Sequence, residues 1–390
     1  MKPFATQEFE GRLSRIHAAM EAKGFDVLLC ASPANMLYAT GYDAWSFYTP
    51  QTVIISPRLA EPIWIGRDMD RIAAEATVFM SPAALIPYAE SELDTPDRLE
   101  TKRVADVLAQ HKLDKGTIAL EMDDYYFSAA IFQALERYLP NARLLDSGRL
   151  VNWVRTVKSD AEIAAMREAG QASIRAVEAG LKAIRPGVRQ CDAVAEMARE
   201  MIRGTPNAGG GWTAAPIFLA AGADGAIHMP FSDRPFEPDS SVSFELGASR
   251  HWYHSPMNRT IHLGRASAQQ ERLAAAVIGA MEQALHVIKA GVVAESVEER
   301  WRTEITKAGY EKGVRIGYSV GLGYPPNWGE LTYSIRKGDR TVLQPNMTFH
   351  FNLGMWAKNL NFSISETIRV TSGGCESLTP FTRKLFTTDA

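Results

Sequence analysis

Apolar positions along the first 150 residues follow helical spacing in some segments and form short continuous runs in others. Helical spacing covers the segments 9–25, 97–113 and 125–139. Short apolar runs, typical of buried strands, occupy 26–32, 51–57, 61–66 and 116–122. This alternation predicts an α/β domain whose mixed sheet is covered by helices.

The pattern changes beyond residue 150. Two long amphipathic helices are predicted within 149–184, the first capped by Ser159 or Asp160, and a third helix lies within 185–202. A glycine-rich loop follows at 208–212, and strand-like segments extend over 213–264. Two more helices are predicted at 268–290 and 295–310, and further strands at 342–356 and 361–371. This order predicts an α+β domain of two similar halves. We therefore expect two domains, 1–150 and 151–390.

Composition excludes several classes of protein. Of the 390 residues, 46% are hydrophobic and 22% charged, which is typical of a soluble globular protein. The net charge of −3 gives no basic surface for nucleic acid. No run of eighteen apolar residues predicts a membrane span, and the first twenty residues lack the apolar core of a secretory signal. The three dispersed cysteines fit a reducing compartment, so a cytoplasmic protein is expected.

The segment 241–264 reads as two strands around a turn and carries unusual chemistry. Pro256 lies within the second strand, where proline cannot donate to the ladder. Glu245 lies on the apolar strand "VSFEL", and burying a carboxylate is costly unless it is paired. Two interpretations follow: a structural ion pair, for example with Arg259, or a carboxylate that faces a cationic substrate.

The order of elements and three stretches of sequence resemble the creatinase/aminopeptidase P family. The stretches are "RTVKSDAEIAAMREAG", "IRPGVRQCDAV" and "SETIRVTSGGCESLT". The resemblance implies a creatinase-type N-terminal domain followed by a catalytic domain with the pita-bread fold. Family members include metallopeptidases, a metal-free creatinase and non-enzymatic binders. An X-Pro metallopeptidase, a creatinase-like amidino hydrolase and a peptide-binding module therefore remain alternatives.

The metallopeptidases of this family hold two divalent ions through two Asp, one His and two Glu. The corresponding residues here are Glu245, Pro256, Tyr318, Asn352 and either Ser365 or Glu366. Divalent cations need several carboxylate or imidazole donors, and at most two of the five remain. We therefore predict a site without metal and without any other cofactor. His254, on the same strand face as Pro256, is the alternative ligand that could rebuild a metal site.

His228 occupies the position where the family keeps a proton-shuttling histidine, just before the strand that carries Glu245. The resemblance implies an acid/base role, and the alternative is a surface-loop histidine.

The stretch "TGYDAWSFYTPQ" at Thr40–Gln51 is rich in aromatic residues. These aromatics could be core packing, but in this family the equivalent loop often reaches over the active site of a partner subunit. Together with "ELGASRHWYHSPMNRT" and "GYSVGLGYPPNWGE", this stretch resembles the sequences of family members that hydrolyse ectoine, a zwitterionic cyclic amidine. The resemblance implies opening of ectoine and hydroxyectoine to N-acetyl-L-2,4-diaminobutyrate by a homodimer, with a deacetylase acting downstream.

The roles expected from this resemblance fall into two groups. Glu245 stabilises or attacks the amidinium carbon, His228 moves the proton, and Tyr318 donates a hydrogen bond. Substrate contacts are expected from an aromatic cage and from polar side chains: Trp45, Phe47, Tyr48, Tyr253, Tyr324, His254, Asn258, His350, Asn352 and Glu366.

Overall fold

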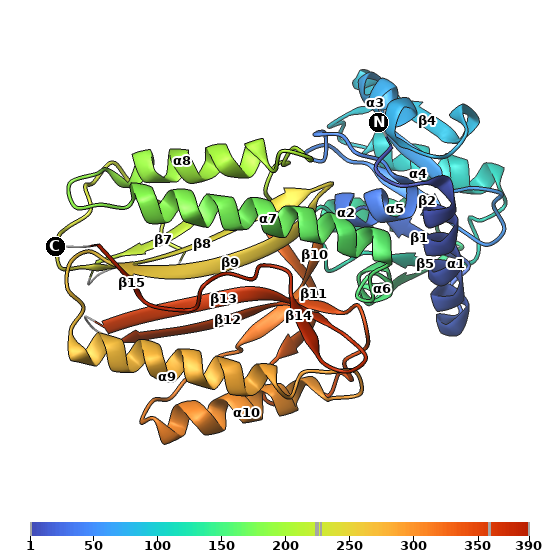
Figure 1. Cartoon of the computed structure of the whole chain (residues 1–390). Coiled ribbons are helices and arrows are strands. Elements are labelled where there is room, and N and C mark those ends of the chain that lie inside the picture. Colours follow the sequence, from blue (N-terminus) through green and yellow to red (C-terminus); the bar gives the residue numbers. More distant parts are fainter. Residues whose placement is uncertain (1, 223–225, 227, 358–359, 389–390) are drawn as a thin grey trace. The chain divides into compact units, whose positions relative to one another are not determined.

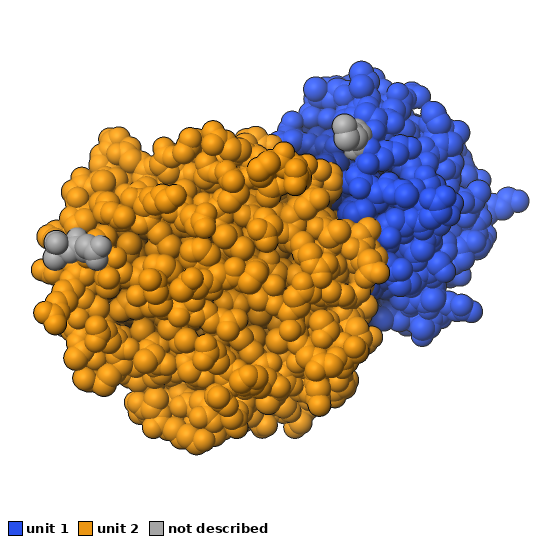
Figure 2. All heavy atoms as spheres, in the orientation of Figure 1, with its two compact units in different colours: residues 1–155 blue, residues 156–390 orange. Residues whose placement is uncertain are grey.

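The structure, a computed structural model, describes residues 2–222, 226, 228–357 and 360–388 (Figure 1). The chain forms two compact units, Met1–Arg155 and Thr156–Ala390 (Figure 2). The short helix α6 (Leu150–Val154) belongs to the first unit, where it packs against α1 (Thr6–Lys23). Among the described residues, no helix combines the length and the apolar character needed to cross a bilayer.

The first unit is built on a six-stranded mixed sheet in the order β4-β3-β2-β1-β5-β6. Its strands are β1 (Val27–Cys30), β2 (Thr52–Ile55), β3 (Ile63–Arg67), β4 (Leu85–Tyr88), β5 (Thr117–Leu120) and β6 (Arg143–Asp146). Its further helices are α2 (Pro33–Thr40), α3 (Arg71–Thr77), α4 (Leu99–Gln110) and α5 (Ala129–Tyr138). Helices α4 and α5 pack against each other and contribute to one buried apolar cluster with the strands. The α/β prediction is confirmed.

The second unit contains a nine-stranded sheet whose main path runs β11-β10-β12-β13-β9-β8-β7. Its strands are β7 (Phe218–Ala221), β8 (Ser241–Arg250), β9 (Tyr253–His262), β10 (Gly317–Tyr324), β11 (Asn327–Ile335), β12 (Thr348–Ala357), β13 (Leu360–Val370), β14 (Cys375–Ser377) and β15 (Phe386–Thr387). Its helices are α7 (Asp160–Ala183), α8 (Gln190–Arg203), α9 (Ala268–Leu285) and α10 (Ala294–Lys307).

The prediction of two long helices within 149–184 is wrong. The segment holds the five-residue α6 and the 24-residue α7. Between them Val157 forms a bridge with Met347, and the Lys158 backbone N–H donates to the carbonyl of Asn346. These extended contacts interrupt the helix. Helix α7 then begins with Ser159 as N-cap, in a capping box with Glu162.

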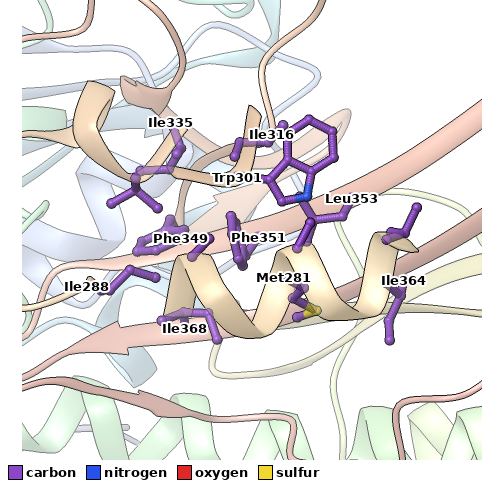
Figure 3. Packing of buried hydrophobic residues seen from close by; sticks show 14 of the residues in the cluster. Met281, Ile288, Trp301, Ile316, Ile335, Phe349, Phe351, Leu353, Ile364 and Ile368 are labelled. Atoms are coloured by element: carbon purple, nitrogen blue, oxygen red, sulfur yellow. The ribbon is translucent and has the colours of Figure 1, made fainter. Parts of the chain in front are cut away.

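The helices of the second unit cover the apolar face of the curved sheet. Helices α7 and α8 pack with β8 and β9, while α9 and α10 pack with β12 and β13 (Figures 1 and 3). Side chains alternate along each strand, so the residues between the core positions point to the opposite, inner face. This inner face is polar, and it carries the candidate site.

Candidate active site

A row of four polar side chains crosses the inner face of the sheet. Glu245 on β8 pairs with Asn258 on β9, which pairs with Ser365 on β13, which in turn pairs with Asn352 on β12. In a flat sheet, strands about 4.8 Å apart would separate the first and last backbones by about 14 Å. The amide nitrogen of Asn352 nevertheless donates to Glu245 Oε2 at 2.6 Å. The sheet therefore curls strongly and closes around this row.

Glu245 is a nearly fully buried carboxylate, with 4% of its surface exposed. Burial raises its pKa to about 7, opposed by the hydrogen bond from Asn352, the charge of Lys312 and the hydrogen bond from Asn258. The carboxylate is therefore close to the point of protonation at neutral pH. A cation bound beside it would favour the ionised form.

Two buried amide oxygens next to Glu245 have no hydrogen-bond partner among the described residues. They are Asn258 Oδ1 and Asn352 Oδ1. The Asn352 amide nitrogen is directed at the carboxylate, which can only accept when ionised, so the amide oxygen has to point elsewhere. An unpaired buried acceptor costs about 1–3 kcal/mol. A ligand with several N–H donors and a positive charge would satisfy both oxygens and the carboxylate together.

One side of the row is a hydrogen-bonded group of uncharged rings. The Trp328 indole N–H donates to the Tyr318 hydroxyl at 2.9 Å, and His350 Nδ1 lies 2.9 Å from the same hydroxyl. His350 Nε2 lies 2.6 Å from the hydroxyl of Ser365. Burial, helped by the charge of Arg315, lowers the pKa of His350 to about 3, so this ring is neutral. Burial also raises the pKa of Tyr318, which keeps its proton at neutral pH.

His254 is buried on the same face but is already engaged. Its Nε2 accepts a hydrogen bond from the backbone N–H of Ala214 at 2.9 Å. Burial lowers its pKa to about 4, so the ring is neutral at neutral pH. Since Nε2 accepts this bond, the proton of the neutral ring is on Nδ1 and no lone pair is left for a metal ion. His254 in this state does not rebuild a metal site.

His228 lies in a partly described segment, of which residues 223–225 and 227 lie outside the described residues. The exposed His228 ring meets the ring of Phe218 edge-on, with the centroids 5.0 Å apart. Phe218 on β7 is the direct cross-strand partner of Glu245. Paired residues point to the same face of a sheet, so Phe218 and Glu245 share the inner face. His228, in contact with Phe218, therefore lies near the end of the row that carries Glu245.

Comparison with known proteins gives the family. Residues 12–157 match the Creatinase/Prolidase N-terminal domain, and residues 164–372 match metallopeptidase family M24. The chain belongs to the M24 family.

Full-length relatives and a solved structure support this assignment. An uncharacterized hydrolase/peptidase of Sinorhizobium fredii is 38% identical over 99% of both chains, and the ectoine hydrolase of Halomonas elongata is 38% identical over 98% of both. The prolidase of Thermococcus sibiricus superposes with a TM-score of 0.84 at 19% identity, covering 98% of this chain and 100% of that one. The pita-bread prediction is confirmed, and this M24 protein is a hydrolase acting on carbon–nitrogen bonds.

The M24 metal positions converge on the inner face but do not carry metal donors. Of the two alternatives for the fifth position, it is Ser365 that joins the row, through its pairing with Asn352 and Asn258. Glu245 is thus the one carboxylate among the five positions, beside Pro256 and three neutral side chains. Among the described residues, no three His, Cys, Asp or Glu side chains are grouped so as to hold a metal ion. This donor set does not fit a dinuclear metal centre.

The prediction that Glu366 contacts substrate is wrong. Glu366 points to the outer face, where Arg383 Nε donates to it at 2.7 Å and the Arg259 guanidinium lies 3.5 Å away. The alternative that Arg259 pairs with Glu245 is wrong for the same reason, since Arg259 is on the outer face too. Adjacent residues of a strand face opposite ways, so the step from Ser365 to Glu366 reverses the side.

Two members of the predicted aromatic cage lie elsewhere. The hydroxyl of Tyr253 donates to Glu162 Oε1 on α7 at 2.8 Å, so this side chain points to the outer face. Tyr324 stacks on Trp252 with ring centroids 4.0 Å apart. It lies six residues along β10 from Tyr318, about 20 Å of extended chain. Both are therefore corrected from substrate contacts to packing residues.

The aromatic residues predicted from the N-terminal domain lie within the first unit. Trp45 and Phe47 contact each other, with ring centroids 4.7 Å apart, and Phe47 meets Tyr126 at 5.6 Å. The mostly exposed Tyr48 accepts a hydrogen bond from Arg67. Their contact with substrate remains a prediction.

Sequence reasoning missed three residues around the row: Phe218, Trp328 and Lys312. Trp328 and Phe218 are neighbours, with ring centroids 6.1 Å apart, and Trp328 holds Tyr318. Lys312, in the loop between α10 and β10, interacts electrostatically with Glu245; burial lowers the Lys312 pKa to about 8. No motif marks any of the three. Trp328 lies within the stretch "GYSVGLGYPPNWGE", but only the fold brings it to the site.

Proposed function

We propose that this M24 protein opens the amidine ring of ectoine, and of hydroxyectoine, by hydrolysis to N-acetyl-L-2,4-diaminobutyrate. The likeness to the ectoine hydrolase of Halomonas elongata supports this substrate. The observation that carries the proposal is the acceptor cluster: one buried carboxylate beside two unpaired amide oxygens. The amidinium group of ectoine is planar and cationic, and it bears N–H donors on both nitrogens.

In the proposed complex the amidinium N–H groups face Glu245, Asn258 Oδ1 and Asn352 Oδ1. The buried acceptors gain donors, and the carboxylate gains a cation at short range, which keeps it ionised. The neutral rings of Trp328 and Tyr318 line one side of the row. A peptide substrate offers no cation at its scissile carbon, so this arrangement favours an amidine.

The chemistry follows from these positions. A carboxylate oxygen of Glu245 attacks the amidinium carbon, and one ring carbon–nitrogen bond breaks while His228 gives a proton to the departing nitrogen. His228 then accepts a proton from a water molecule that attacks the adduct and releases the carboxylate. The water oxygen ends on the acetyl carbon, and the released amine gains two protons. One comes from His228, which the first water proton replaces, and the other is the second proton of the water. Tyr318, which keeps its proton, donates to the reacting group.

We further propose that no metal takes part. The carbon of an amidinium is already electrophilic, so a nearby carboxylate and a water-poor site can replace a Lewis acid. The five family positions keep a single carboxylate, which agrees with this chemistry.

Removal of metal is expected to leave ring opening unchanged. Wild-type protein dialysed against EDTA should convert ectoine at the rate of untreated protein, followed by NMR of the product. Metal content is measured on the same samples. Loss of turnover on chelation that manganese, zinc or cobalt restores would contradict the proposal. A panel with an Xaa-Pro dipeptide and creatine tests the two alternative hydrolases, and turnover of either in place of ectoine would contradict the proposal.

The pH dependence of kcat/KM for ectoine is expected to be bell-shaped. Glu245 must be ionised, so activity falls as pH drops below its raised pKa of about 7. The positive charge of Lys312 favours the ionised form of Glu245, so activity falls again as Lys312 loses its proton above its lowered pKa of about 8. A profile that is flat from pH 6 to pH 9 would contradict both assignments.

A homodimer in which the Trp45–Tyr48 loop reaches the site of a partner subunit remains part of this proposal, as does a downstream deacetylase. Light scattering of the purified protein tests the first point.

A further inference from the structure

Lys312 has a charge that acts on Glu245 but no assigned contact with the substrate, and two aromatic rings surround it. Its ammonium lies 5.9 Å from the ring centroid of Trp301 and 5.6 Å from that of Trp356. Trp301 is fully buried in the α9–α10 core (Figure 3), and Trp356 is on β12. The ammonium therefore lies close to two aromatic rings, where cation–π attraction holds it.

The loop that carries Lys312 runs beside the row of polar side chains. The carbonyl of Ile316 accepts from the backbone N–H of Asn352, so the end of the loop lies against β12 at the site. Trp356 and Asn352 share a strand face, with Gly354 between them. A β-carbon at Gly354 would lie 1.6 Å from the Trp356 ring, so this ring lies across Gly354. Lys312 is thus near Asn352, the residue at the end of the row whose amide donates a hydrogen bond to Glu245.

The Lys312 ammonium can accept further partners as far as the described part of the chain shows. Among the described residues, the structure gives Lys312 neither a hydrogen-bond acceptor nor an ion-pair partner within 4.0 Å, although the group carries three N–H donors. The charge of Glu245 nevertheless raises the pKa of Lys312 against the dominant effect of burial. A cation and an anion are therefore close to each other without direct contact.

This arrangement matches a compact zwitterion. In ectoine the carboxylate is attached to the ring carbon next to an amidine nitrogen, so both charges sit on one small ring. We propose, on the basis of the proposed function, that Lys312 binds the substrate carboxylate. This contact fixes the orientation of the ectoine ring relative to Glu245. Arg315, on the same loop, stacks over the Tyr318 ring and donates to Ser334, so its guanidinium is already engaged.

The test combines a change in the protein with a change in the substrate. We expect Lys312→Gln to raise KM for ectoine about 10- to 100-fold, as for loss of a hydrogen bond to a charged group. For 2-methyl-1,4,5,6-tetrahydropyrimidine, which lacks the carboxylate, wild type should already show this weaker binding. For this compound, Lys312→Gln should weaken binding little further, measured as KM or as an inhibition constant. Lys307→Gln, at an exposed lysine paired with Glu304, is the matched control and should behave as wild type.

Three outcomes overturn the assignment. Equal losses for both compounds would show that Lys312 supports Glu245 rather than the carboxylate, because any effect on Glu245 is common to the two. An unchanged KM for ectoine in Lys312→Gln, or the expected pattern in Arg315→Gln instead, would also overturn it. These results all require that wild type opens ectoine. If it does not, the proposed function itself fails, and the role of Lys312 fails with it.

Discussion

Replacing Glu245 with Gln is expected to abolish ring opening and at the same time to stabilise the fold. The amide cannot act as a nucleophile or balance the amidinium charge, so kcat/KM for ectoine should fall at least about 10³-fold. The buried carboxylate has a raised pKa of about 7, so the native state binds its proton more tightly than the unfolded state does. Stability is therefore lost as pH rises from the ordinary carboxyl range to about 7. Glutamine has no such loss.

The gain should depend on pH. At pH 8 we expect Glu245→Gln to raise the free energy of unfolding by about 1–3 kcal/mol, and the gain should shrink toward pH 5. Urea unfolding at both pH values measures it. The exposed Glu299→Gln is the control and should change neither activity nor stability. A destabilised Glu245→Gln at pH 8 would mean that Glu245 is a structural residue, and retained turnover would exclude it as the reacting group.

Replacing Glu366 with Gln should have the opposite signature: a large loss of stability with chemistry retained. Glu366 and Arg259 are both fully buried, and Arg383 completes the group. Removing the carboxylate leaves the Arg259 charge buried without its counter-ion, which costs about 3–5 kcal/mol. Because Glu366 is on the outer face, folded protein should still open ectoine with nearly unchanged KM.

Glu376→Gln is the matched control for this second variant. Glu376 also binds two arginines, Arg167 and Arg369, but at the surface, where an ion pair is worth only about 0–1 kcal/mol. Urea unfolding of both variants, with kinetics at a temperature where each is folded, separates the two carboxylates. A stable Glu366→Gln variant whose KM for ectoine is strongly raised would restore Glu366 as a substrate contact.

Part of the site could be predicted because it depends only on which residue type occupies each of the family's metal positions. Glu245 is recognisable from the sequence as a carboxylate in an apolar strand. The loss of metal donors is equally local, since Pro256, Tyr318 and Asn352 lack the carboxylate or imidazole group whatever the fold does. Helices α7, α9 and α10 follow from apolar spacing in the same way, whereas the second long helix expected within 149–184 does not form.

The predictions of site residues were wrong where the direction of a side chain, or a partner far away in the sequence, determines what the residue contacts. Tyr253 is near Glu245 in the sequence but points away from it, because its hydroxyl reaches Glu162 on α7. Ser365 and Glu366 are adjacent, and the pleat of β13 puts one in the site and the other in an ion pair.

The amino-acid sequence by itself determined the family, the order of elements and the single carboxylate left among the former metal positions. Only the tertiary structure decided which residues surround that carboxylate. Asn352 contacts Glu245 because the sheet curls, and Lys312 lies near Glu245 because the loop before β10 passes beside β12. Such contacts join residues far apart in the chain, and local spacing carries no information about them.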